Sequence, residues 1–114
     1  MEDCLFCRII AGEIPSDKLY EDDGFIAFRD INPQSPVHVL VVPKKHKERL
    51  ADCSDNDKTM LSGLLLVANK VARDEGIAES GYRVTINSGP EGGQLIYHLH
   101  LHLMGGHKLS DQMG

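Results

Sequence analysis

Three histidines, His98, His100 and His102, alternate with leucines in the segment YHLHLHLMGG, residues 97–106. In a β-strand, residues two apart point to the same face, so the three imidazoles are expected to form a row backed by buried leucines. At a rise of about 3.3 Å per residue, neighbouring histidines lie about 6.6 Å apart and the outer two about 13 Å apart. Two neighbours could share a metal, but a single ion could bind all three only if the strand were bent. The spacing therefore predicts that the three histidines divide their tasks.

A glycine-rich segment, SGPEGGQ at residues 88–94, immediately precedes the histidines. Consecutive backbone N–H groups in such a loop form a concavity that binds anions, which favours a phosphate ligand. A neutral imidazole is a competent nucleophile near pH 7 because its ordinary pKa is about 6.5. A neighbouring imidazole can then stabilise the phosphoryl oxygens by hydrogen bonding. The pattern predicts a phosphohistidine-type intermediate that water resolves. The alternative is a solvent-facing edge strand, for which serine, threonine, lysine or glutamate would serve equally well.

Composition limits the class of protein. The chain has 114 residues, a formal net charge of −5 and a sequence pI of about 5.6, which disfavours a nucleic-acid-binding protein. Its longest apolar stretches, such as 39–42 and 64–68, span four or five residues, so no membrane segment is expected. The N-terminal MEDCLFCRII lacks the pattern of a signal peptide, and we expect a cytoplasmic protein.

Periodicity and turn residues predict the elements that position the histidines. A short helix is expected within residues 5–15, and a hairpin over 18–30 turns at Asp-Asp-Gly; further strands are expected over 37–43, over 81–87 and along the histidine segment. One long helix is expected from about residue 55 to residue 75, capped by Ser54 with Asp57 and ended by Gly76. Five strands and one long helix indicate an α+β domain with an antiparallel sheet.

These segments together resemble one known family. IIAGEIPS, YEDD, AFRDINPQSPVHVLVVPKKH and YHLHLHLMGGH are similar to the histidine triad (HIT) superfamily, and in particular to its Hint branch of nucleoside phosphoramidate hydrolases. The resemblance implies one HIT domain over residues 1–114 and a homodimer in which the sheets of two chains join. It also implies a purine nucleotide substrate, a derivative of AMP or GMP.

The resemblance also implies roles for individual residues. His100 would attack the α-phosphorus of a purine nucleoside phosphoramidate, His102 would hydrogen-bond the phosphate, and His38 would support the triad from behind. Asp30 would accept hydrogen bonds from the ribose hydroxyls, since an ionised carboxylate can take two donors at once. Phosphate and ribose-side oxygens would be bound by Asn87, Gly92, Gly93 and Gln94. The base pocket would be walled by Leu5, Phe6, Ile9, Phe28 and Ile31, for which a plain core role is the alternative.

Cys4 and Cys7 have the C-x-x-C spacing of half a tetrahedral zinc site. His46 and His98 are the candidates for the other two ligands, and this set resembles the one found in many bacterial HIT proteins and in the related uridylyltransferases. A structural zinc would attach the N-terminal segment to the histidine strand. An unreactive thiol pair and a redox pair are the alternatives, although no thioredoxin-like βαβ pattern surrounds the cysteines.

Two departures from the Hint branch concern the leaving group. Leu95 stands where many animal members carry a serine, and the tail HKLSDQMG lacks the family's tryptophan-containing ending. They concern how the amine is protonated and which amine is accepted. Independently of them, two other functions stay open: a dinucleoside polyphosphate hydrolase, as in a sister branch that shares the H-x-H-x-H strand, and a nucleotide-binding regulatory module with vestigial activity.

Overall fold

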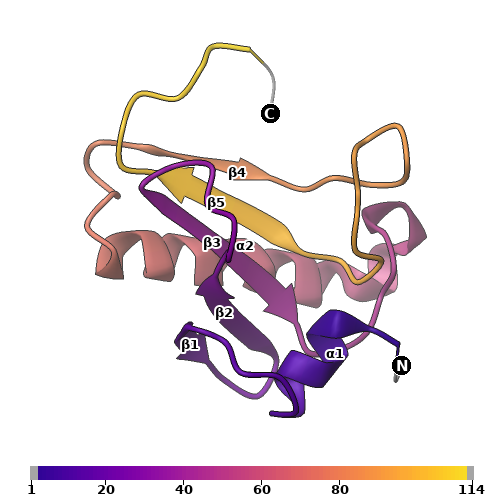
Figure 1. Ribbon diagram of the computed structural model, residues 1–114. Helices are drawn as coiled ribbons and strands as arrows, with labels where there is room; N and C mark the ends of the chain where they lie inside the picture. The colour runs from indigo at the N-terminus through magenta and orange to yellow at the C-terminus, as the bar shows by residue number, and fades with distance from the viewer. Residues whose placement is uncertain (1–2, 113–114) are drawn as a thin grey trace.

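The computed structural model describes residues 3–112, in which five strands form one antiparallel sheet of order β1-β2-β3-β5-β4 (Figure 1). The strands are β1 (Lys18–Glu21), β2 (Phe25–Arg29), β3 (Val37–Pro43), β4 (Tyr82–Thr85) and β5 (Leu101–Gly105). The helices are α1 (Leu5–Ile10), α2 (Lys58–Asp74) and the short 3₁₀ turns η1 (Leu50–Asp52) and η2 (Asp55–Asp57). The α+β architecture expected from the sequence, a five-stranded antiparallel sheet with one long helix, is confirmed.

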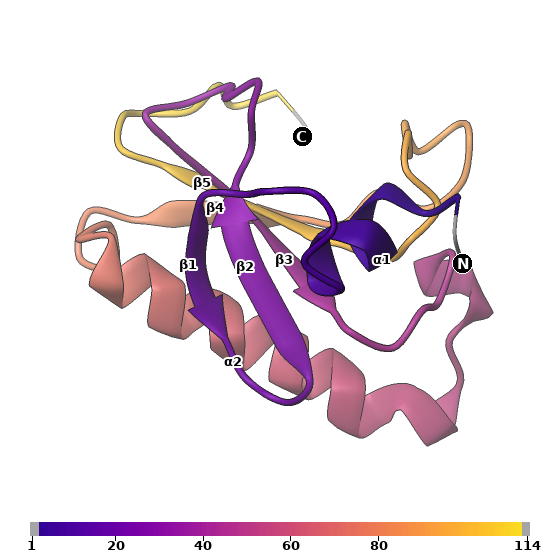
Figure 2. The ribbon, with the colours of Figure 1, turned by 60° about the horizontal axis from the view of Figure 1, so that its bottom comes forward.

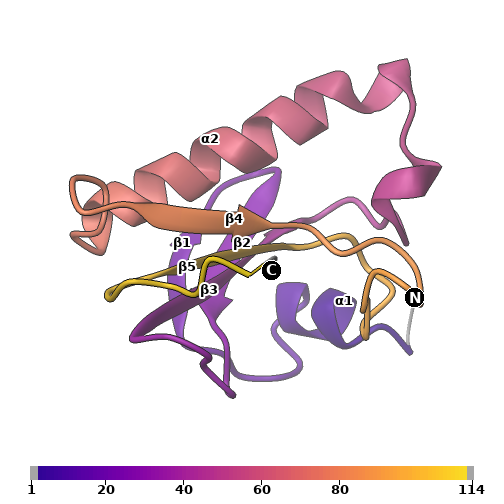
Figure 3. The same ribbon diagram turned by 90° about the horizontal axis from the view of Figure 1, so that it is seen from above.

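The two helices lie on opposite faces of the sheet, as Figure 3 shows. The long helix α2 packs its apolar stripe, which includes Leu64, Ala68 and Val71, against the leucines of β5 and the valines of β3. The other face carries a smaller apolar cluster around Phe6 of α1, and α1 lies in front of this face in Figure 2. No helix within residues 3–112 is both long and apolar enough to cross a membrane.

The long helix begins later than the sequence predicts. Residues 55–57 form the 3₁₀ turn η2, and the α-helix starts only at Lys58. The expected capping pair is present on η2: the Ser54 N–H donates to Asp57 Oδ2 at 3.0 Å, and the Asn56 N–H donates to Ser54 Oγ at 3.3 Å. A capping residue satisfies the free N–H groups of a first turn whether that turn is 3₁₀ or α-helical. The capping pattern therefore predicts where the helical segment starts but not that its first turn is 3₁₀.

The histidine strand is shorter than predicted. Only His102 lies within β5, whereas His98 and His100 precede it, so the expectation of one regular strand carrying all three is wrong. The β3–β5 ladder stops at the pair Val41 and Leu101, although β3 itself continues to Pro43 against β2. Proline has no N–H to donate, and the Pro43 carbonyl accepts a hydrogen bond from the ring of His98 instead.

All three histidines are at least largely shielded from solvent, and β5 is flanked on both sides by β3 and β4. The alternative of a solvent-facing edge strand is therefore wrong. The intervening leucines are buried as expected, with Leu99, Leu101 and Leu103 no more than 1% exposed.

Candidate active site and metal cluster

The ring of His100 is oriented by a backbone carbonyl. Its Nδ1 lies 2.7 Å from the carbonyl oxygen of His98. A carbonyl can only accept, so Nδ1 carries the proton and Nε2 keeps a free lone pair. The residue is 8% exposed, and burial lowers its pKa below the ordinary histidine value. At neutral pH His100 is thus an uncharged imidazole with one nitrogen available for attack, as a nucleophile requires.

The ring of His102 has the opposite tautomer. The backbone N–H of Gln34 donates to His38 Nδ1 at 3.0 Å, so the proton of the neutral His38 ring is on Nε2. That Nε2 lies 3.0 Å from Nδ1 of His102 and 3.5 Å from Oδ2 of Asp30. Nδ1 of His102 accepts the shorter bond, which leaves Nε2–H of His102 as a donor. Burial, with smaller effects of His100 and His38, lowers the pKa of His102 to about 4.

The two rings are neighbours, with centroids 5.1 Å apart. His100 offers a lone pair and His102 an N–H donor on the same side of the sheet. A phosphoryl group needs both: a nucleophile for phosphorus and a donor for the oxygens on which charge develops. The arrangement therefore suits attack on a phosphorus centre, as the sequence predicts.

Four further side chains form a metal-ligand cluster: Cys4, Cys7, His46 and His98, whose ligand atoms all lie within 4.8 Å of one another. Sγ of Cys4 and Sγ of Cys7 lie 3.2 and 3.6 Å from Nδ1 of His98, and Sγ of Cys7 lies 3.3 Å from Nδ1 of His46. Ligand atoms around a tetrahedral zinc are roughly 3.3–3.8 Å apart, given its usual bond lengths. Two sulfurs and two nitrogens at these separations fit zinc.

The tautomer of His98 supports the same conclusion. Its Nε2 donates to the Pro43 carbonyl at 2.7 Å, so Nδ1 is unprotonated and its lone pair faces the sulfurs. Burial, followed by the effects of Cys4, raises the pKa of the Cys7 thiol to about 11. A half-buried thiol with a raised pKa is a poor redox nucleophile but becomes a thiolate beside a cation, which favours a metal site over a redox pair.

The residues expected to wall a base pocket are split between core and surface. Phe6 and Phe28 are core residues, with ring centroids 5.6 Å apart, and Ile9 packs against them. Leu5 and Ile31 are 41% and 91% exposed. The two phenylalanines thus belong to the core, and the exposed pair is accessible to a ligand; contact of any of the five residues with a base stays a prediction.

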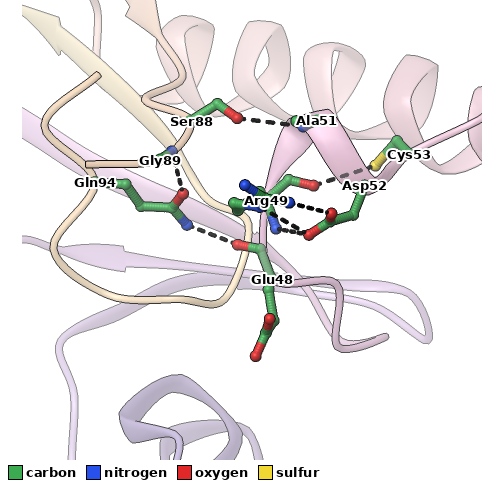
Figure 4. A network of polar contacts seen from close by, with 8 residues as sticks. All are labelled: Glu48, Arg49, Ala51, Asp52, Cys53, Ser88, Gly89 and Gln94. Carbon is green, nitrogen blue, oxygen red and sulfur yellow. Dashed lines mark hydrogen bonds and ion pairs between the residues drawn. The ribbon is translucent and has the colours of Figure 1, made fainter. Parts of the chain in front are cut away.

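The glycine-rich loop is held by Gln94, as Figure 4 shows. The Gln94 amide donates to the carbonyls of Glu48 at 2.6 Å and Ile96 at 3.0 Å, and Oε1 accepts from the Gly89 N–H at 2.9 Å. The side chain is 5% exposed, so in this arrangement Gln94 shapes the loop rather than presenting a free donor.

Backbone geometry requires glycine at positions 92 and 93 of this loop. A Cβ on Gly92 would lie 2.6 Å from the Ser88 carbonyl oxygen, and Gly93 has φ of +81°. The loop can therefore form only with glycine-like freedom at these positions. Asn87, just before the loop, is half-buried, and contacts of Asn87, Gly92 and Gly93 with phosphate stay predictions.

Sequence reasoning missed three groups that set the tautomers: the Gln34 N–H and the carbonyls of Pro43 and His98. All belong to the backbone, so their side-chain types give no signal. Only the fold shows which carbonyl or N–H faces which ring.

Fold and site together define a small α+β protein in which a buried histidine with a free ring nitrogen lies beside a histidine N–H donor. Residues 11–109 match the HIT domain, and the chain belongs to this family. It is 45% identical over 112 residues to the purine nucleoside phosphoramidase of Escherichia coli K12, a match covering 98% of this chain and 94% of that protein.

Two solved structures are also similar. A HIT family hydrolase from Legionella pneumophila superimposes with a TM-score of 0.96 at 46% identity, covering 98% of this chain and 100% of that one. A zinc-bound histidine triad family protein from Mycobacterium smegmatis gives a TM-score of 0.79 at 32% identity, covering 99% of this chain and 84% of that one. The HIT fold and membership of a hydrolase family are thereby established for this chain.

Proposed function

We propose that this protein hydrolyses purine nucleoside 5′-phosphoramidates to a nucleoside monophosphate and an amine. The observation that carries the proposal is the opposite tautomers of His100 and His102, which place a lone pair beside an N–H donor. The similarity to the E. coli purine nucleoside phosphoramidase supports this choice of substrate.

The reaction proceeds in two displacements. Nε2 of His100 attacks the α-phosphorus, the P–N bond breaks, and the amine leaves with a proton drawn from solvent. The Nε2–H of His102 donates to a phosphoryl oxygen as charge develops on it. Water then attacks the phosphorus, the P–Nε2 bond of the nucleotidyl-His100 breaks, and the nucleoside monophosphate is released. The net reaction consumes one water, and His100 recovers its lone pair.

Substrate binding would use groups around these two histidines. Asp30 would take the ribose hydroxyls, Leu5 and Ile31 would contact the base, and the loop with Gly92 and Gly93 would approach the phosphate with its backbone N–H groups. The exposure of Leu5 and Ile31 supports their part, because a binding surface must be open before the ligand arrives.

A trapping experiment tests the mechanism. Protein mixed with adenosine 5′-phosphoramidate and quenched with base, which preserves phosphohistidine, should gain the mass of one adenylyl group on His100. His100→Ala should lose turnover almost completely while still binding AMP. Unchanged turnover in this variant would remove His100 as the nucleophile, and absence of turnover in the wild type would leave only the binding-module function.

A competition assay separates the two enzymatic functions. Adenosine 5′-phosphoramidate and diadenosine polyphosphates are compared by kcat/KM under the same conditions. A preference of about tenfold or more for the polyphosphate, equivalent to about 1.4 kcal/mol in the barrier, would make the protein a dinucleoside polyphosphate hydrolase instead.

We also propose that Cys4, Cys7, His46 and His98 hold a structural zinc. The donor set and the separations of the ligand atoms support it, as does the zinc-bound relative from M. smegmatis. When bound, zinc would supply a cross-link between α1, the segment after β3 and the segment before β5. Elemental analysis of protein purified without added metal should give about one zinc per chain.

Finally, we propose a homodimer in the cytoplasm. The strand β4 is at the edge of the sheet, and Val84 on it is 37% exposed. Leu65 and Leu66 of α2 are 50% and 64% exposed, which leaves apolar surface for a partner to cover. Sedimentation at micromolar concentration should give twice the chain mass. Three free cysteines are consistent with a reducing compartment.

A further inference from the structure

The segment that carries the proposed nucleophile lies outside every strand. His98 and His100 precede β5, so ladder hydrogen bonds do not hold them. Two bonds attach this segment to the end of β3 and to the chain just after it: Nε2 of His98 donates to the Pro43 carbonyl, and the Leu99 N–H donates to the Lys47 carbonyl at 2.6 Å. The position of His100 thus depends on how firmly His98 is held.

His98 contacts both functional clusters at once. Its ring nitrogen Nδ1 faces the sulfurs of Cys4 and Cys7 at 3.2 and 3.6 Å, and its carbonyl oxygen accepts from Nδ1–H of His100 at 2.7 Å. The side chain therefore belongs to the metal cluster, while the main chain orients the nucleophile.

We propose that His98 is a positioning residue that couples metal occupancy of the cluster to the position and tautomer of His100. A metal on Nδ1 fixes the ring and hence the carbonyl that keeps the His100 proton on Nδ1. Without the metal, the carbonyl moves more freely and His100 exchanges between its two tautomers. The catalytic part of this inference rests on the proposed function, whereas the structural coupling does not.

The helix α1 provides a second connection between the same two clusters. It has only six residues, Cys4 is its N-cap and Cys7 is within it. A helix this short has little stability of its own, so core packing of Phe6 and a metal bound to the cysteines would together hold it in place. Its Phe6 ring lies 6.0 Å from the His98 ring and 5.0 Å from the His100 ring, edge to face. A metal that holds both cysteines also holds Phe6 against the nucleophile.

The cluster is open to a chelator in the folded protein. Cys4 and His46 line a surface hollow of about 400 Å³, together with residues of the N-terminal segment and of the loop before β5. Metal removal therefore does not require unfolding, and the coupling can be measured on the folded protein.

The principal experiment compares the ring ¹⁵N shifts of His100 in zinc-loaded and chelator-treated protein. The loaded protein should show a single Nδ1–H tautomer. The metal-free protein should show Nε2 shifted toward its protonated value. Its kcat for adenosine phosphoramidate should fall about 10- to 100-fold with KM little changed, the range typical of groups that orient an active-site ligand.

Matched variants separate the cluster from a general histidine effect. His46→Ala removes one ligand while His98 itself is kept, and should reproduce the metal-free shifts. His46→Cys also removes the edge-to-face contact with the His98 ring but keeps four ligands, and should give the loaded shifts. His107→Ala, on an exposed histidine after β5, should change neither shift nor kcat. Identical His100 shifts with and without metal, in protein of unchanged circular dichroism, would overturn the coupling.

A second measurement decides the matter if metal-free protein does not stay folded. In cadmium-loaded protein the ¹¹³Cd resonance should move when AMP binds beside His100, because coupling between two sites is reciprocal. A resonance that stays in place while AMP binds would refute the proposal. Both spectroscopic readouts hold even if the protein cleaves no phosphoramidate, so the two proposals can fail separately.

Discussion

Nε2 of His38 lies 3.0 Å from Nδ1 of His102, and this contact determines which way His102 presents its proton. The direction is set at the start of a short chain, because the Gln34 backbone N–H can only donate to His38. Each ring then accepts on Nδ1 and donates from Nε2. A backbone amide thus determines, through two imidazoles, that Nε2 of His102 presents a donor to the proposed phosphate site.

Replacing His38 should test this series of hydrogen bonds from Gln34 to His102. His38→Leu keeps a side chain of similar size but removes the donor, so His102 is free to adopt either tautomer. We expect kcat for adenosine phosphoramidate to fall about 10- to 100-fold. His38→Gln retains an N–H donor and should recover part of the loss. Steady-state kinetics of both variants provide the measurement. Equal kcat for wild type and His38→Leu would show that the bond from His38 to His102 is not needed for turnover.

Acid should destabilise the fold through His102. In the folded protein the pKa of His102 is lowered to about 4, mainly by burial, against about 6.5 in an unfolded chain. Below pH 6.5 the unfolded state binds a proton that the folded state does not, so the free energy of unfolding falls as the pH drops toward 4. The contribution of His102 is complete above pH 6.5, and at most about 3 kcal/mol of stability is lost by pH 4.

Urea unfolding between pH 7.5 and pH 4.5 measures this slope. His102→Gln cannot titrate, so its free energy of unfolding should fall less steeply over this range than that of the wild type. The difference between the two curves isolates His102 from the other histidines, which titrate in both proteins. Parallel curves would show that His102 does not titrate differently in the two states.

The elements were predictable because their signals are local. The turn at residues 22–24 forms as expected, since Asp22 Oδ1 accepts from the N–H groups of Gly24 and Phe25, and Gly76 ends α2 with φ of +76°. The spacing of Cys4 and Cys7 likewise predicted half of a metal site, and the fold brings the two expected partners, His46 and His98, to them.

The start of β5 and the tautomers of the histidines depend instead on distant parts of the chain. The β3–β5 ladder ends at the pair Val41 and Leu101, two residues before β3 ends at Pro43. The two tautomers follow from an N–H and a carbonyl in segments outside the strands, those of Gln34 and His98. Periodicity in the histidine segment carries no trace of either. The alternation correctly predicted a shared face and buried leucines, but it could not show where the strand begins.

Gln94 should be more important for stability than for direct contact with substrate. Its amide satisfies two carbonyls and one N–H in a buried position. Gln94→Ala leaves these groups unpaired, at a cost of about 1–3 kcal/mol in the free energy of unfolding. Gln94→Glu keeps the shape but sets a carboxylate against the carbonyls of Glu48 and Ile96, and should cost at least as much.

Thermal unfolding of the two Gln94 variants measures this effect. Ser88→Ala is the control, because Ser88 Oγ accepts only one exposed N–H, that of Ala51, and its loss should change stability little. Gln94 variants that are as stable as the wild type but bind AMP weakly would instead assign the side chain to the ligand.

Asp30 should discriminate between ribose and a sugar without hydroxyls. One carboxylate oxygen accepts from the Asn32 N–H at 2.8 Å and the other lies 3.5 Å from Nε2 of His38, so the group is held in place beside the histidines. An ionised carboxylate held in this way can accept from two hydroxyls, and each such charge-assisted bond contributes about 1.5–3 kcal/mol.

Asp30→Asn should therefore raise KM for adenosine phosphoramidate by about tenfold or more. For the 2′,3′-dideoxy analogue, which offers no hydroxyls, wild type and variant should have similar KM. Steady-state kinetics with both substrates give the four values. A loss of equal size on both substrates would assign Asp30 to the support of His38 alone and remove it from the ribose site.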